Sequence, residues 1–170
     1  MRKKAAEHND PTITAELIRK IRISRHLTQK ELAVRAGITE GYVRKIEATR
    51  NEDAAPKSPS LPVLVSIAVA LDVSLDSLWN QRDYKDVPKE SRKQPRYDPE
   101  VAGRLIYSAI ENKAKEDEDM PDTAVLVEGE IEIDMQYLIE IKRGKKTPSF
   151  ELLTSIADTL RVSLDSLVFE

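Results

Sequence analysis

Cysteine is absent from this chain of 170 residues, and histidine occurs only at His8 and His26. The lack of cysteine excludes disulfide bonds, thiolate metal sites and cysteine nucleophiles. Two isolated histidines are too few for a metal site or a catalytic cluster, and the carboxylates are scattered. We therefore expect a protein that is not an enzyme and that has no catalytic residue, no metal site and no cofactor.

Long apolar runs are also missing. No stretch approaches the roughly 18 apolar residues that a membrane span needs, and the basic start Met1–Lys4 does not lead into the apolar core of a signal peptide. We expect a cytoplasmic protein with no membrane partner. Hydrophobic residues make up 40% of the chain, charged residues 34%, and there are 5 glycines, a composition that favours a helix-rich globular protein.

The charge is unevenly distributed along the chain. Residues 1–85 carry 15 Lys and Arg against 11 Asp and Glu, a net charge of +4. Residues 98–170 carry 8 against 17, a net charge of −9. Only the first half is therefore expected to seek a polyanion such as a nucleic acid.

An internal repeat indicates two copies of one structural unit. The segments Ser66–Leu78 and Ser155–Leu167 are identical at 10 of 13 positions, which is very unlikely by chance. We assign the first copy to residues 1–80 and the second to residues 98–170. The intervening residues 81–97 hold charges and two prolines and are predicted to be a linker.

Capping residues divide the first copy into short helices. Thr28 is predicted to start the second helix in a capping box with Glu31, and Gly37 to end it. Thr39 then caps a third helix over Glu40–Glu47. With a helix before Thr28, a fourth from Ser60 and a fifth from Ser74 to about Trp79, the fold class is all-α, with five short helices in a small bundle.

The order and spacing of these residues resemble the lambda-repressor/Cro-type helix-turn-helix family, also called the xenobiotic response element family. The residues that carry the resemblance are Thr28-Gln29, Leu32-Ala33, Gly37, Tyr42-Val43, Ile46-Glu47, Pro59-Ser60-Leu61 and Ile67-Ala68. The resemblance implies two lambda-repressor-like domains of five helices each, of which the second is degenerate. It also implies that the third helix of the first copy enters the DNA major groove.

The resemblance assigns roles to residues of the first copy. Residues at the groove are Thr39, Glu40, Gly41, Arg44 and Lys45, where Gly41 either contacts DNA or permits a close approach of the backbone. Arg44 or Lys45 would donate to guanine, and Glu40 would accept from cytosine. Phosphate contacts fall to Gln29, Tyr42, Arg50 and Asn51. Arg22 and Glu47 stand where the family has an internal ion pair.

The second copy departs from this pattern. Aligning Tyr137-Leu138 on Tyr42-Val43 places Lys142 where Glu47 stands, and gives a third helix that exposes Asp134, Met135, Gln136, Ile139 and Glu140. An acidic face is repelled by phosphates. Residues Met135, Gln136, Ile139 and Glu140 are therefore predicted to contact a protein; the alternative is a copy that decayed into a stabilising appendage.

Residues 122–134 allow two interpretations. Equal spacing with the first copy favours a helix and turn capped by Asp122. The alternation of Val125, Val127, Ile131 and Ile133 around Glu128-Gly129 is instead typical of a β-hairpin. We favour the helix.

These observations predict a sequence-specific DNA-binding transcriptional regulator, a repressor, that uses its first copy. Its partner would be double-stranded DNA with an inverted-repeat operator, bound as a homodimer. The alternative is an antiactivator whose acidic second copy binds and blocks a partner transcription factor.

Overall fold

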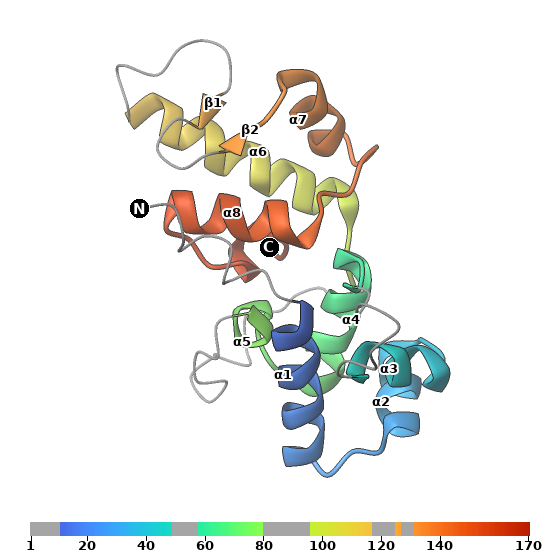
Figure 1. The fold of residues 1–170 in the computed structure, drawn as a ribbon. Coiled ribbons are helices and arrows are strands. Elements are labelled where there is room, and N and C mark those ends of the chain that lie inside the picture. Colours follow the sequence, from blue (N-terminus) through green and yellow to red (C-terminus); the bar gives the residue numbers. More distant parts are fainter. Residues whose placement is uncertain (1–10, 49–57, 80–95, 117–124, 127–130) are drawn as a thin grey trace. The chain divides into compact units, whose positions relative to one another are not determined.

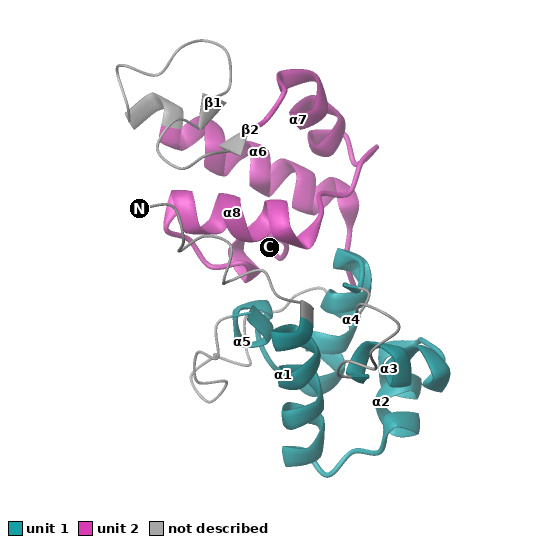
Figure 2. Cartoon of the chain, in the orientation of Figure 1, with its two compact units in different colours: residues 1–90 teal, residues 91–170 magenta. Residues whose placement is uncertain are grey.

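The computed structural model describes residues 11–48, 58–79, 96–116, 125–126 and 131–170. The chain divides into two compact units, Met1–Glu90 and Ser91–Glu170, which are coloured separately in Figure 2. The greater part of the predicted linker 81–97 lies outside the described residues. None of the helices in the described part of the chain combines the length and the apolar character that a membrane span requires.

The first unit is built in its described residues from five α-helices (Figure 1), which pack around one apolar core. They are α1 (Pro11–Ser24), α2 (Gln29–Ala36), α3 (Glu40–Glu47), α4 (Leu61–Leu71) and α5 (Leu75–Trp79). The core is filled by the buried side chains of Ile18, Ile21, Leu32, Leu64, Ile67, Leu71 and Leu78. Helix α3 adds Val43 and Ile46, so all five helices contribute and the bundle has a single core of its own.

The start of α2 shows how local sequence sets the helix boundaries. The Thr28 hydroxyl accepts from the Glu31 backbone N–H at 3.1 Å, and the Glu31 carboxylate accepts from the Thr28 backbone N–H at 2.7 Å. The predicted capping box is thus confirmed. The hydrogen bond from the Thr28 backbone, with that from its hydroxyl, holds the pKa of Glu31 below its ordinary value because both favour the charged carboxylate.

The turn between α2 and α3 depends on Gly37. Its φ of 68° is in the left-handed region, which side chains disfavour. The chain reverses there with hydrogen bonds from Gly37 N–H to Val34 C=O at 3.3 Å and from Ile38 N–H to Ala33 C=O at 3.0 Å. Ala33 is buried beside this turn, and α3 therefore packs directly against α2.

The second unit has three α-helices among its described residues, α6 (Pro99–Glu116), α7 (Met135–Lys142) and α8 (Phe150–Leu160), followed by a short 3₁₀ helix, η1 (Asp165–Leu167). Between α6 and α7 lie two short strands, β1 (Val125–Leu126) and β2 (Ile131–Glu132). They pair antiparallel, with Val125 opposite Glu132 and Leu126 opposite Ile131.

At Val125–Leu126 and Ile131–Glu132 the favoured helix is therefore wrong, and the described residues there pair as the hairpin alternative expects. Val125 and Ile131 are β-branched and prefer extended backbone. This local preference prevails over the spacing shared with the first copy. The second unit accordingly lacks the five-helix layout expected of it in its described residues; Asp122, the expected cap, lies outside them.

The repeat in the sequence corresponds to a repeat in the structure. Helices α4 and α8 each have 11 residues, and each ends at a residue with φ 55°, Asp72 and Arg161 respectively. Helices α3 and α7 each have 8 residues and are preceded by the N-caps Thr39 and Asp134. The two units thus share the elements at their C-terminal ends and differ where α2 is replaced by β1 and β2.

Candidate nucleic-acid interface

Helix α3 is anchored by one face and exposed on the other. Val43, Ile46 and Glu47 are buried, while Thr39, Gly41, Arg44 and Lys45 are exposed and Glu40 and Tyr42 are half-exposed. The Thr39 hydroxyl accepts from the Tyr42 backbone N–H at 3.2 Å and fixes the first turn. The residues of α3 and its cap that are predicted to meet DNA are therefore all at least partly accessible.

Two of these residues contact each other. The Arg44 guanidinium donates through Nη2 to Glu40 Oε1 at 2.8 Å, one helical turn away. The two side chains are 67% and 42% exposed, so the pair is on the surface of the helix. The sequence prediction treated the two separately, although their i, i+4 spacing was the signal for an ion pair.

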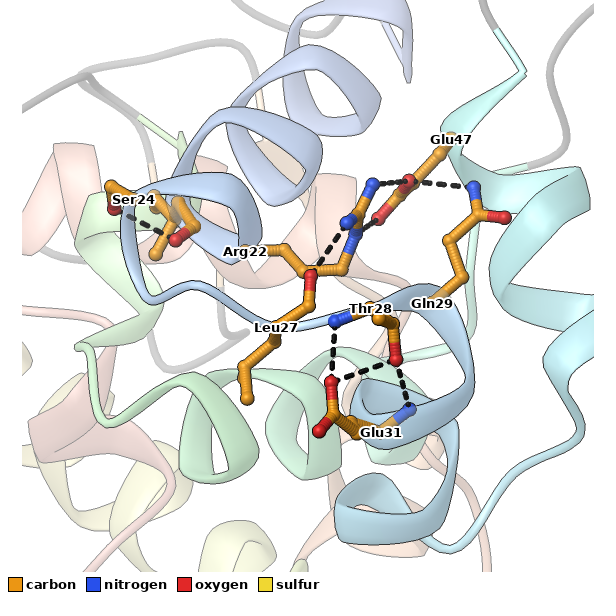
Figure 3. A network of polar contacts seen from close by, with 8 residues as sticks. Arg22, Ser24, Leu27, Thr28, Gln29, Glu31 and Glu47 are labelled. Carbon is orange, nitrogen blue, oxygen red and sulfur yellow. Dashed lines mark hydrogen bonds and ion pairs between the residues drawn. The ribbon is translucent and has the colours of Figure 1, made fainter.

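A buried polar network fixes α3 to the rest of the unit, as Figure 3 shows. Arg22 of α1 donates to both carboxylate oxygens of Glu47, at 2.6 and 2.7 Å, and to the Leu27 carbonyl at 2.7 Å. The internal ion pair implied by the resemblance is thereby confirmed. The hydrogen bond to Glu47 raises the pKa of Arg22 in spite of its burial.

Gln29 joins this network at the start of α2. Its Nε2 donates to Glu47 Oε2 at 2.9 Å (Figure 3). A side-chain amide has two N–H groups and a carbonyl oxygen, so this contact leaves groups that can reach a phosphate. The predicted phosphate contact at Gln29 thus stays a prediction, and its side chain is positioned by a link to α3 that the sequence did not show.

Gly41 has no steric role within the described part of the unit. A methyl group added at its Cα would find none of the described atoms within 4 Å, and its φ is not in the left-handed region. The protein itself therefore tolerates a side chain there, and open space beside the helix backbone remains for a partner. The predicted phosphate contacts Arg50 and Asn51 lie outside the described residues.

Helix α7 offers a different surface at the equivalent positions. Met135, Ile139 and Glu140 are half-buried, and only Asp134 and Gln136 among the five predicted to face solvent are fully exposed. The expected exposure of Met135, Ile139 and Glu140 is thus only partial, and the protein contact expected at these residues stays a prediction. Ile139 and Glu140 take the positions that Arg44 and Lys45 hold in α3.

Lysines at the end of α7 and in the turn after it contact other side chains of the unit. Lys146 pairs with Glu140 at 2.8 Å, which raises the Lys146 pKa. Lys142, at the position of Glu47, places its ammonium 3.5 Å from the centre of the Tyr107 ring. Lys146 is thus held by a carboxylate and Lys142 by an aromatic ring.

Comparison with known proteins concerns the first unit. Residues 18–78 match the helix-turn-helix family, which confirms the lambda-repressor/Cro-type resemblance over these residues. No curated protein and no solved structure matches the chain. The family match indicates a DNA-binding domain of the kind found in transcription regulators, and it includes α2, the Gly37 turn and α3.

Proposed function

We propose that this protein is a sequence-specific transcriptional repressor that reads DNA with α3 of its first unit and carries out no catalytic step. The observation that carries the proposal is the division of α3 into two faces. Val43, Ile46 and Glu47 hold the helix in place, and Arg44 and Lys45 extend from the opposite side. A helix of this kind fits the major groove with its first turns at the base edges.

The predicted interface residues have distinct roles in this proposal. Arg44 and Lys45 donate to guanine, and Thr39 contacts a base edge. The DNA backbone comes close to Gly41, where open space allows it. Phosphate oxygens are bound by Tyr42, Arg50, Asn51 and Gln29, the last aided by the N-terminus of α2.

Two copies of the chain are proposed to occupy an inverted-repeat operator. One small helix-turn-helix unit makes too few base contacts to be highly specific, and paired units dock with centres about 34 Å apart, one turn of the DNA. Occupancy of a promoter by such a pair would block transcription, as expected for the repressors of the xenobiotic response element type. The second unit is proposed to be a degenerate copy of the first.

The test uses the full-length protein in a fluorescence anisotropy titration. DNA from upstream of its own gene is compared with a scrambled duplex of the same composition, at several salt concentrations. We expect tighter binding to the upstream DNA, and Arg44→Ala should weaken it roughly 5- to 150-fold, the range for one bidentate base contact. Arg143→Ala removes the same charge from an exposed position after α7 and should leave binding unchanged. Equal affinities for the two duplexes at every salt concentration would refute sequence-specific binding.

A second candidate function is that of an antiactivator. It is favoured by Ile139 and Glu140 in the positions of Arg44 and Lys45, because this exchange removes the donors that read bases. A partner transcription factor would contact Met135, Gln136, Ile139 and Glu140. Gln136 is exposed, so Gln136→Lys should spare folding and DNA binding. If regulation in cells is also unchanged, this candidate loses its support.

A further inference from the structure

We infer that Glu40 and Arg44 act as one unit that reads both bases of a single G·C pair, and that the operator half-site therefore contains an invariant G·C pair in one orientation. This inference rests on the proposed function and specifies which base pair α3 selects. It starts from the ion pair between the two side chains, with Arg44 Nη2 at 2.8 Å from Glu40 Oε1.

The ion pair adds little to the stability of the fold. Its side chains are 67% and 42% exposed, and exposed pairs at i, i+4 contribute little because water and salt screen them. A carboxylate at this place also weakens the attraction of α3 to phosphates. Glu40 thus lowers the sequence-independent affinity for DNA, as expected of a residue that adds selectivity for particular base pairs.

The donors and acceptors of the pair match one edge of G·C. In the major groove guanine presents N7 and O6 as acceptors, and its partner cytosine presents the N4 amino group as a donor. O6 and N4 are hydrogen-bonded to each other across the base pair, so they lie about 2.9 Å apart. The donor Nη2 and the acceptor Oε1 are separated by nearly the same distance, 2.8 Å. The side-chain pair can therefore place a donor on guanine and an acceptor on cytosine together.

The ion pair between Glu40 and Arg44 does not have to break when the two side chains contact the bases. A guanidinium has five N–H groups, and a carboxylate has two oxygens with several acceptor sites. Arg44 can keep one N–H on Glu40 while two others reach O6 and N7. Glu40 can accept from Arg44 and from cytosine N4 at once. The contact seen in the free protein thus preorganises the bound state.

The surroundings of the pair keep its geometry defined and accessible. The first turn of α3 is fixed by the Thr39 cap, and Val43 and Ile46 hold the helix from its buried side. Gly41, next to Glu40, has no side chain that would keep the DNA away from the helix, and the position of its missing Cβ lies in open space among the described atoms.

The test is selection of the full-length protein on randomised DNA duplexes, followed by titration of the four base pairs at each selected position. Wild type should require G·C at one position. Arg44→Ala and Glu40→Ala should each reduce discrimination at that same position about tenfold, because each removes one side of the paired contact. The double variant should do little more than Arg44→Ala alone. Glu16→Ala makes the same charge change on an exposed residue of α1 and should leave the preference intact.

Each outcome decides one of two questions. If Glu40→Ala alters the preference at a different position from Arg44→Ala, or alters none, the inference is overturned while the proposed function stands. If wild type enriches no sequence at all, the proposed function itself fails. Circular dichroism of each variant separates a loss of preference from a loss of folding.

Discussion

Arg22 and Glu47 link α1 to the end of α3. They are only 8% and 3% exposed, and both Glu47 oxygens accept from the guanidinium. A buried charge is costly unless it is paired, so the removal of one partner leaves the other without compensation. The same carboxylate also accepts a hydrogen bond from Gln29. Glu47 therefore both links α1 to α3 and positions a predicted phosphate contact.

Replacement of Arg22 by Ala should lower the free energy of unfolding of the first unit by about 3–5 kcal/mol, because Glu47 stays buried with its charge unpaired. Trp79 is the single tryptophan and is buried in α5, so its fluorescence in a urea titration reports on this unit. The control is the double change Arg22→Met with Glu47→Leu. It removes both charges and should lower the free energy of unfolding far less. A loss below about 1 kcal/mol for Arg22→Ala would show that Glu47 is not desolvated in solution.

Gly41→Ala should separate folding from DNA binding at one residue. The added methyl group meets no described atom, and alanine is favoured over glycine in a helix by roughly 0.5–1 kcal/mol, less near its end. We expect equal or slightly greater stability by Trp79 fluorescence, together with weaker binding to the operator by anisotropy. Unchanged affinity would mean that the DNA backbone does not come close to this residue.

The helix boundaries of the first unit could be predicted from local sequence alone. Thr28, Glu31 and Gly37 satisfy orphan backbone groups through contacts between residues close in the chain, and such contacts leave a pattern in the sequence. The pairing of β1 with β2 could not be predicted with the same certainty. Residues 122–134 carry both an alternating pattern and the spacing of a helix-turn-helix, and the two indicate different structures.

Part of the candidate site could also be predicted. Arg44 and Lys45 were placed on the exposed face because Val43 and Ile46 define the buried one. The bond between Gln29 and Glu47 joins residues 18 positions apart, and its geometry depends on how α2 and α3 cross. The partial burial of Met135 and Ile139 likewise depends on packing that periodicity does not describe.

At the scale of helices, α6 lies close against the backbone of α7 at Gly103. A Cβ there would collide with the Ile141 carbonyl and lie 3.1 Å from the Lys142 Cα, both parts of the α7 backbone. The two helices can therefore pack at this distance only with glycine at the crossing.

Gly103→Ala should destabilise the second unit by about 1–3 kcal/mol, the usual cost of overpacking. Hydrogen exchange followed by mass spectrometry should show faster exchange in α7 and α8, with α2 and α3 unchanged. Ser108→Ala on the exposed side of α6 is the matched control. Normal protection of α7 in the Gly103 variant would contradict the close crossing of these helices.

On the scale of the whole molecule, the two units have separate cores and opposite charges. Leu64, Ile67 and Leu78 are buried in the first unit, and Ile106, Leu138 and Ile141 in the second. Residues 1–85 and 98–170 have net charges of +4 and −9. Affinity for DNA at low salt comes mostly from the release of counterions from phosphates, so this difference should decide which unit binds.

Residues 1–80 expressed alone should bind DNA, and residues 98–170 should not. The first fragment retains the helices α1–α5 with Arg44 and Lys45, whereas the second has Ile139 and Glu140 in their place. Circular dichroism comes first, because a fragment that fails to fold has no bearing on binding. Each fragment should be helical, since each contains its own core.

The affinity of the first fragment for DNA should fall linearly with salt concentration on logarithmic axes, with a slope of about −0.9 for each phosphate contacted. Arg44→Ala in this fragment should leave that slope nearly unchanged, because a base contact releases no counterion. Comparable low-salt affinities of the two folded fragments for DNA would contradict this prediction. They would show that α7 or the basic residues after it bind phosphates despite the net negative charge of the second unit, and the division of function between the units would have to be abandoned.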